Sequence, residues 1–453
     1  MIKIYFTSDL HGFGFPVGFK KDENTLIIDG GDVLQGSPFA QYCWRELGDF
    51  AVFADIMNDC GYDFVTLGNH DFNYGRKALA GYLDKLNAQC VCENAGYPYA
   101  MKTMPGGTKI GVVGIVTDFV NVWEKPENLD GLVITDAFEA AKHALAELSG
   151  KVDLTICIYH GGFEKDLESG KLLSETSENI GCKICEELNF DILLTGHQHV
   201  GLPGRDYHGT YVIQPAHSAQ GYACLRVSDG KISSEVCPPN GFVGIPDAGL
   251  ERKVQAWLDQ PVGELRAALP VSDRVEMAVD GSPLADFFNH VQMKYSGAQV
   301  SAASLANDAK GLPKKLRRRD LFAAYPYSNT FLVLEITGRQ LRAAIERSAE
   351  YLACENDRLI VSEHFLKPKV EHYNYDFFAG VDFEVDYRRP EGSRIVWLKR
   401  EGKDVSGGDV LTICVNNYRS TGAGGYSVYP QCPVSSVIDR EMADMLLDYF
   451  SDG

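Results

Sequence analysis

A set of polar residues in the first half of this sequence has the side-chain types that bind metal ions. Each lies where an apolar run meets glycine, in the segments KIYFTSDLHG, LIIDGGD, FVTLGNHD, LTICIYHGG and DILLTGHQH. The residues are Asp9, His11, Asp32, Asn69, His70, His160, His197 and His199. Imidazole nitrogens mixed with carboxylate and amide oxygens form a ligand set that divalent transition metals accept. One Asp-x-His segment is usually a loop feature, but five such segments in this order point to a site.

Ligands of this kind suit the hydrolysis of phosphate esters. The attacking and leaving oxygens both bring negative charge to an anionic phosphorus, and this raises the barrier. Two cations about 3.5 to 4 Å apart bind both sides of the displacement and activate water. We therefore expect an enzyme with two divalent metal ions as cofactors. Mn or Zn is the preferred assignment, with Fe, Co or Mg as alternatives.

The elements that position these residues are expected to be short buried strands, each followed at once by a polar loop. Helical patterns alternate with the strands up to about residue 236, over 49–60, 75–87, 136–148 and 174–188. This alternation is typical of an α/β domain with covered sheets.

A connector and a second domain are expected after this region. The segment CPPNGFVGIPDAG is rich in Pro and Gly, and a helical stretch over 250–258 follows it before Pro261. Beyond it, FLVLEITG and RQLRAAIERSAEYL read as a strand, a turn and an amphipathic helix. We predict a first domain over 1–240, a linker with a helix over 241–262, and a second domain over 263–453.

The charge balance argues against large anionic partners. The 453 residues include 43 Lys plus Arg and 62 Asp plus Glu, a formal charge of −19. This disfavours a nucleic-acid polymer or an anionic membrane as the partner and leaves a small-molecule substrate. The basic run KKLRRR over 314–319 is interpreted as a solvated face. Protein partners are not indicated.

The N-terminus and the cysteines bear on location. The sequence enters its first strand at Ile2 with no export segment before it, and it has no apolar run of about 18 residues. A cytoplasmic location is expected, and a periplasmic or extracellular one would follow if a signal peptide had been removed.

The 12 cysteines are interpreted as reduced thiols. The Cys182 and Cys185 pair is read as helix-borne rather than metal-binding or redox-active.

The five segments closely resemble those of the calcineurin-like metallophosphoesterases, within the two-domain family of 5′-nucleotidases and 2′,3′-cyclic-nucleotide phosphodiesterases. The resemblance covers both halves of the chain. It implies an α/β (α+β) protein, with an N-terminal metallophosphatase β-sandwich flanked by helices and a C-terminal α/β nucleotidase substrate-binding domain.

The resemblance also implies a role for each residue of the set. Asp9, His11 and His199 would bind one metal, Asn69, His160 and His197 the other, and Asp32 would bridge the two. His70 would be the catalyst that faces the substrate phosphate and acts on the leaving oxygen. His217, in QPAHSAQGY, is interpreted as structural.

Two tyrosines of the second half lie within family motifs. Tyr375 in HYNYDFFAGVDFEVD and Tyr418 in NNYRSTGAGGY occupy the places of the aromatic residues that stack a nucleobase in similar proteins. A stacking platform of this kind accepts every base, because each base offers a π face.

Three departures from the 5′-nucleotidase branch guide the choice of substrate. Its N-G-G-G-[IV]-R segment reads SAASLANDAKG here, without the arginine. Gly424 replaces the Asp that holds the ribose hydroxyls, and Asn73 replaces the Asp that pairs with the catalytic histidine. Asn73 can still orient His70 by hydrogen bonding, but it cannot lend a charge.

These departures resemble the cyclic-phosphodiesterase branch. We expect hydrolysis of 2′,3′-cyclic nucleotides to 3′-nucleotides and then to nucleosides. The alternative is a 5′-nucleotidase or UDP-sugar hydrolase. A minor alternative is an inactive nucleotide-binding module, which is disfavoured because no predicted ligand and no catalytic histidine has been lost.

Overall fold

The computed structural model describes the chain except for residues 17–18, 174–176, 239–241, 244, 246, 328, 368, 439 and 452–453. The chain folds into two compact units, Met1–Val254 and Gln255–Gly453, and the boundary falls inside helix α8 (Ala248–Leu258). Parts of the predicted linker over 241–262 lie outside the described residues, so the predicted domain limits stay a prediction.

The first unit is built on two six-stranded sheets. The first sheet has the order β13-β12-β1-β3-β4-β5 and consists of β1 (Ile2–Thr7), β3 (Thr25–Asp29), β4 (Phe64–Val65), β5 (Gln89–Cys90), β12 (Tyr222–Ser228) and β13 (Lys231–Cys237). The second has the order β10-β11-β9-β8-β7-β6 and consists of β6 (Ala100–Thr103), β7 (Lys109–Val116), β8 (Leu154–His160), β9 (Ile192–Thr195), β10 (Leu202–Tyr207) and β11 (Thr210–Gln214). In each sheet the central strands are parallel, so their carboxyl ends share one edge.

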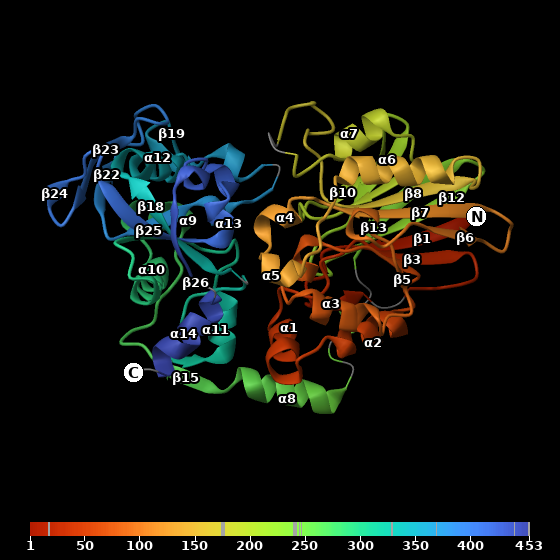
Figure 1. Cartoon of the computed structure of the whole chain (residues 1–453), viewed down its shortest axis with the longest axis horizontal. Coiled ribbons are helices and arrows are strands. Elements are labelled where there is room, and N and C mark those ends of the chain that lie inside the picture. The colour runs from red at the N-terminus through yellow and green to blue at the C-terminus, as the bar shows by residue number, and fades with distance from the viewer. Residues whose placement is uncertain are drawn as a thin grey trace. The chain divides into compact units, whose positions relative to one another are not determined.

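Helices cover the outer faces of both sheets (Figure 1). The helices of this unit are α1 (Pro38–Tyr42), α2 (Ala51–Cys60), α3 (Arg76–Leu83), α4 (Val120–Trp123), α5 (Pro126–Leu129), α6 (Ala137–Leu148) and α7 (Gly181–Glu187). Alternate residues of a strand point to opposite faces. Ile4 and Phe6 therefore enter the core between the sheets, whereas Tyr5 packs with α2 and α3. The predicted β-sandwich flanked by helices is confirmed.

One predicted helix is shorter than its sequence pattern indicated. The prediction covered 174–188, but α7 begins at Gly181, and residues 174–176 lie outside the described part of the chain. Residues 177–180 are not helical because their polar groups bind elsewhere. The Glu178 carbonyl accepts hydrogen bonds from the hydroxyls of Thr117 and Tyr159, and the Asn179 side chain accepts one from the Gly162 backbone.

The second unit contains a five-stranded sheet with the order β21-β16-β25-β18-β26. Its strands are β16 (Val300–Ser304), β18 (Phe331–Thr337), β21 (Asp376–Ala379), β25 (Val410–Asn416) and β26 (Val434–Ile438). Smaller sheets pair β15 (Pro261–Glu264) with β17 (Lys315–Arg317), β19 (Leu352–Glu355) with β20 (Arg358–Val361), and β23 (Ile395–Arg400) with β22 (Asp382–Val385) and β24 (Lys403–Asp404). The mixed α/β class predicted for the chain is confirmed.

Helices pack on both faces of this five-stranded sheet. They are α9 (Arg274–Asp280), α10 (Pro283–Ser296), α11 (Arg318–Ala324), α12 (Gly338–Ala349), α13 (Asn417–Ser420) and α14 (Met442–Ser451). The predicted strand FLVLEIT is β18, and the helix after it is α12. Thr337 and Gln340 cap α12 reciprocally, which is why the helix begins where the strand ends.

The basic run over 314–319 forms β17 and the start of α11, and acidic residues lie beside it. Arg317 and Arg319 both contact Asp259, and Lys314 contacts Glu264. None of the helices in the described part of the chain has both the length and the apolar character that crossing a bilayer requires.

Candidate metal centre

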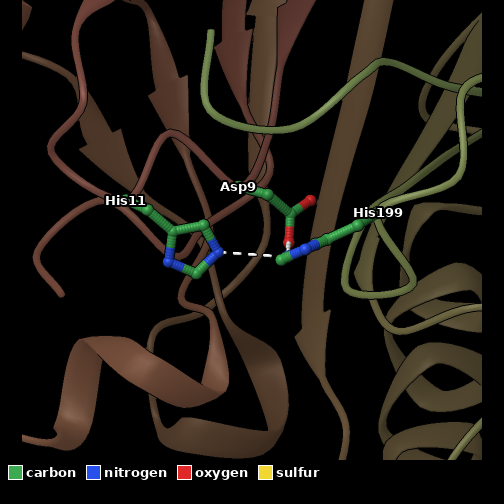
Figure 2. A group of neighbouring side chains, drawn as sticks. All are labelled: Asp9, His11 and His199. Carbon is green, nitrogen blue, oxygen red and sulfur yellow. Dashed lines mark hydrogen bonds and ion pairs between the residues drawn. The ribbon is translucent and has the colours of Figure 1, made fainter. Parts of the chain in front are cut away.

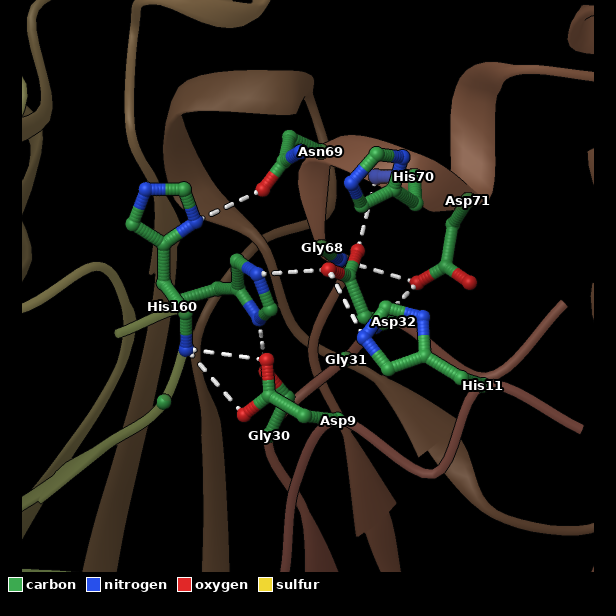
Figure 3. Close-up of polar contacts among 12 residues, drawn as sticks. Asp9, His11, Gly30, Gly31, Asp32, Gly68, Asn69, His70, Asp71 and His160 are labelled. Carbon is green, nitrogen blue, oxygen red and sulfur yellow. Dashed lines mark hydrogen bonds and ion pairs between the residues drawn. The ribbon is translucent and has the colours of Figure 1, made fainter. Parts of the chain in front are cut away.

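All the predicted ligands follow strands whose carboxyl ends meet at one edge of the first unit. They follow β1, β3, β4 and β9 or, for His160, end β8. Figure 3 shows Asp9, Asp32 and His160 close together at this edge. The two sheets are joined here, because His160 Nδ1 donates to the Gly30 carbonyl over 2.7 Å. Residues far apart in sequence therefore converge in one place.

The first group consists of Asp9, His11 and His199 (Figure 2). His11 Nε2 lies 3.0 Å from His199 Nε2, which is in turn 3.3 Å from Asp9 Oδ1. His11 Nδ1 lies 2.8 Å from the Gln35 carbonyl and must donate to it, because a carbonyl only accepts. Its Nε2 then carries the lone pair and faces the other two residues. This is how an imidazole ligand is oriented for a cation.

The second group consists of Asp9, Asp32 and His160. His160 Nε2 lies 3.2 Å from Asp32 Oδ2 but makes no hydrogen bond, although it is fully buried. An unsatisfied buried nitrogen beside a carboxylate oxygen fits a shared metal ion. The same Asp32 oxygen lies 3.9 Å from His11 Nε2. Asp32 thus faces histidines of both groups, as the predicted bridge would.

Asn69 and His197 form a third contact. His197 Nδ1 lies 2.9 Å from Asn69 Oδ1, and its Nε2 lies 2.8 Å from Glu178 Oε1. A ring that donates from Nε2 to Glu178 presents the Nδ1 lone pair beside the amide oxygen. Two acceptors side by side would suit one cation, as predicted for Asn69 and His197. The ring of Trp123 also stacks on His197, with centroids 5.6 Å apart and planes 17° apart.

At the centre, the backbone adopts left-handed conformations that residues other than glycine rarely take. Five predicted ligands have positive φ: Asp9 (56°), His11 (51°), Asp32 (59°), His197 (70°) and His199 (57°). Each such residue destabilises the fold by roughly 1–3 kcal/mol, and hydrogen bonds between the loops offset this loss. The Asp9 and His11 N–H groups donate to the carbonyls of Gly31 and Asp32, and the His197 N–H donates to the Asp9 carboxylate.

Asp71 organises two of these loops, although it was not among the residues predicted from the sequence. Its carboxylate accepts hydrogen bonds from the backbone N–H groups of Asp32, Val33, Leu34 and Gly68 at 2.8 to 3.0 Å. The loops approach so closely that a Cβ added at Gly31 would lie 2.3 Å from the Gly68 nitrogen. The sequence contained one signal for Asp71, because it is the acidic residue that ends GNHD, directly after the candidate catalyst His70.

His70 lies beside both groups. Its backbone N–H donates to Asp32 Oδ1 over 2.7 Å, and its ring is 5.6 Å from that of His11. Its Nδ1 lies 2.8 Å from Asn73 Oδ1, so the predicted catalyst is in contact with Asn73, the residue predicted to orient it in catalysis. His217, predicted to be structural, stacks on His199 with centroids 4.6 Å apart and also lies at the centre.

The charges of the centre shift one another. Burial opposes protonation of His160, but its interactions with Asp32, with Asp9 and with the Gly30 carbonyl together outweigh burial and raise the pKa of His160 to about 10. Burial would raise the pKa of Asp9, yet its hydrogen bond and charge interaction with His199 hold this pKa well below its usual range. The charges of His160 and His70 likewise outweigh burial and lower the pKa of Asp32. Both carboxylates are therefore ionised and ready for a cation.

The two tyrosines predicted to bind substrate belong to the second unit. Tyr375 is half-buried, donates to the Ala278 carbonyl over 3.0 Å and packs against the rings of Tyr351 and Phe377. Tyr418 is also half-buried and lies beside the Arg419 guanidinium. Their role in binding stays a prediction.

A buried ion pair holds the segments of these two tyrosines together. Arg419 donates two hydrogen bonds of 2.9 Å to Asp376, and it also donates to the carbonyls of Tyr373 and Ala423. Because Tyr375 precedes Asp376 and Tyr418 precedes Arg419, this pair joins the two family motifs of the second half.

Comparison with known proteins agrees with this architecture. Residues 2–201 match the calcineurin-like phosphoesterases, and residues 261–431 match the 5′-nucleotidase C-terminal domain. A 2′,3′-cyclic-nucleotide 2′-phosphodiesterase/3′-nucleotidase of Haemophilus influenzae is 24% identical over 93% of this chain and 80% of its own. The trifunctional nucleotide phosphoesterase YfkN of Bacillus subtilis is 24% identical over 95% of this chain, which spans 35% of that protein.

A solved structure is more similar. A Staphylococcus aureus protein assigned as a 5′-nucleotidase, crystallised with alpha-ketoglutarate, has a TM-score of 0.90 and 34% identity over 100% of this chain and 97% of its own. Calcineurin-like phosphoesterases are hydrolases that bind two divalent metals, and the residues described above could hold them. The chain belongs to the calcineurin-like phosphoesterases that carry a 5′-nucleotidase C-terminal domain.

Proposed function

We propose that this chain hydrolyses 2′,3′-cyclic nucleotides to 3′-nucleotides and then removes the remaining phosphate to leave nucleosides. The substrate would be a small nucleotide. Its phosphorus would lie against the groups formed by Asp9, Asp32 and the neighbouring histidines. In this proposal the catalytic domain is 1–240, the substrate-binding domain is 263–453, and 241–262 connects them.

Two divalent cations, Mn or Zn by preference, would supply charge neutralisation and an activated water when bound. Asp9, His11 and His199 would hold one, Asn69, His160 and His197 the other, and Asp32 would contact both. His70 would present its Nε2 to the phosphate and donate a proton to the leaving ribose oxygen. Tyr375 and Tyr418 would bind the base by stacking.

The environment of Gly424 is the observation that carries the choice of ester. In the 5′-nucleotidase branch, the residue at this place is an Asp that holds the ribose hydroxyls. Gly424 has a φ of 72°, and a Cβ added there would lie 2.2 Å from Arg419 Nη1 and 2.3 Å from Asn374 Oδ1. Arg419 cannot move aside because its guanidinium is engaged with Asp376. A ribose clamp at this position is therefore disfavoured, and the 2′ and 3′ oxygens stay available to carry phosphate.

The alternative is a 5′-nucleotidase or UDP-sugar hydrolase. The 34% identity to the assigned 5′-nucleotidase of Staphylococcus aureus favours it. An inactive nucleotide-binding module is a third reading, and any turnover under metal-replete conditions excludes it.

A substrate panel tests the proposal. The purified chain with Mn or Zn should turn over 2′,3′-cyclic AMP and 3′-AMP well ahead of 5′-AMP and UDP-glucose. Faster hydrolysis of 5′-AMP would reverse the ranking of the two branches. Elemental analysis of the same preparation should find about two metal ions per chain.

A further inference from the structure

We propose that Glu124 positions the catalyst His70 through the amide of Asn73. This inference rests on the proposed role of His70. Asn73 Nδ2 donates to Glu124 Oε2 over 2.6 Å, and Asn73 Oδ1 lies 2.8 Å from His70 Nδ1. A carboxylate from a loop 51 residues away thus lies one amide behind the catalyst.

The donors and acceptors that link Glu124, Asn73 and His70 can be assigned in only one way. An ionised carboxylate only accepts, so the NH₂ group of Asn73 must face Glu124. The amide oxygen must then face His70, and the ring must donate to it from Nδ1. Glu124 therefore fixes the Asn73 oxygen as the acceptor for the Nδ1–H of His70. This contact orients the ring, so that Nε2 faces the leaving oxygen to which it donates its proton.

The carboxylate of Glu124 is fixed on its other side as well. Its Oε1 accepts from the Lys125 backbone N–H and from Asn128 Nδ2, both over 2.8 Å. Asn128 Nδ2 also donates to the Asn73 carbonyl over 2.9 Å. Because both oxygens of Glu124 accept from donors at fixed positions, the group cannot rotate to release Asn73.

The arrangement compensates for a departure noted in the sequence. Asn73 is neutral where the 5′-nucleotidase branch has an Asp, and Glu124 returns a negative charge to this side of His70. The same segment buttresses the metal ligands, since the adjacent Trp123 stacks on His197. Glu124 acts through Asn73 and does not touch the reacting atoms, so it is a positioning residue.

The isosteric substitution Glu124→Gln tests the polarity. A glutamine can keep its oxygen against Lys125 and Asn128, and its NH₂ group then faces the NH₂ of Asn73. Asn73 must flip, which presents a donor to the Nδ1–H of His70 and removes the acceptor that orients the ring. We expect kcat for 2′,3′-cyclic AMP to fall about 10–100-fold, with KM and metal content unchanged. The loss should be smaller for p-nitrophenyl phosphate, whose leaving group needs little protonation.

Two further variants serve as a control and a reference for this measurement. The control Glu127→Gln alters an exposed glutamate of the same segment and should behave like the parent. His70→Ala should lose at least as much activity as Glu124→Gln. If His70→Ala is fully active, the proposed role of His70 fails. If His70→Ala is inactive and Glu124→Gln keeps the parent kcat, only the inference about Glu124 is overturned.

A rescue experiment gives the sharpest outcome. Asn73→Asp alone sets two carboxylates against each other and should lower activity. Combined with Glu124→Gln, the new carboxylate accepts from both the glutamine amide and His70, so kcat should exceed that of either single variant. A double variant no better than the single ones would overturn the proposal.

A spectroscopic readout is independent of turnover. Nitrogen-15 NMR of histidine-labelled protein, with His70 assigned by comparison with His70→Ala, should show a hydrogen-bonded Nδ1–H on this ring in the parent. Glu124→Gln should shift this Nδ1 signal, because the hydrogen bond to Asn73 is lost. An unchanged signal would contradict the proposal.

Discussion

The two units treat buried charge in opposite ways. In the first, Asp9, Asp32 and His160 leave a buried nitrogen without a hydrogen bond, and the loops around them have left-handed backbone. In the second unit, Asp376 and Arg419 are as deeply buried, but they form an ion pair with two hydrogen bonds. The Asp376–Arg419 pair thus neutralises its charges within the chain, whereas the buried carboxylates and imidazoles of the first unit fit added cations, as the proposed ligand set requires.

Arg419→Ala, in the second unit, should have the largest effect on stability. It leaves Asp376 buried without its partner, which costs about 3–5 kcal/mol. Urea unfolding followed by tyrosine and tryptophan fluorescence measures the loss. Arg388→Ala is the matched control, because Arg388 is exposed and its pair with the half-buried Asp386 contributes at most about 1 kcal/mol. Equal effects of the two variants would show that burial of the Asp376 pair has no energetic weight.

His70→Ala separates chemistry from metal binding within the first unit. We expect turnover of 2′,3′-cyclic AMP to fall about a hundredfold or more, equivalent to about 2.7 kcal/mol of transition-state stabilisation. Metal content should stay at the parent value, because His70 is assigned as a catalyst and not as a ligand. Loss of metal in this variant, measured by elemental analysis, would show that its role is misassigned.

The pH dependence of metal affinity tests the role of His160 in the first unit. Interactions with Asp32, Asp9 and the Gly30 carbonyl raise the pKa of His160 to about 10 in the metal-free site, so a metal must displace a proton from this ring. Affinity should therefore fall as pH decreases below about 10, by up to about tenfold per pH unit, which is about 1.4 kcal/mol. Competition with a chromophoric chelator between pH 6 and 9 measures this. Affinity that does not change with pH would contradict the proposed role of His160.

The cysteines should show the smallest effect. Burial raises the pKa of Cys182 to about 11 and that of Cys185 to about 12. At pH 8 roughly one Cys182 thiol in a thousand is then a thiolate, so both should resist a thiol reagent in the native protein. Rapid modification of either, located by peptide mass spectrometry with urea-unfolded protein as the reference, would reopen the reading of this pair as a redox or metal site.

The predicted ligand segments could be recognised in the sequence because their signals are local. A buried strand followed by a polar residue and glycine is visible within ten residues, and the structure brings all five segments to one edge. Helix limits were less accurate where side chains bind distant groups, as Glu178 and Asn179 do before α7. A periodic pattern does not reveal such contacts.

Local sequence was thus sufficient for the α/β class, the side-chain types of the candidate centre and their places after strands, because periodicity and ligand chemistry are properties of neighbouring residues. The positions of Glu124 behind Asn73, of Trp123 on His197 and of Arg419 against Gly424 were accessible only in the folded chain. The physical reason is that hydrogen-bond polarity, stacking and steric exclusion depend on which loops become neighbours, and packing of the sheets and helices sets those neighbours.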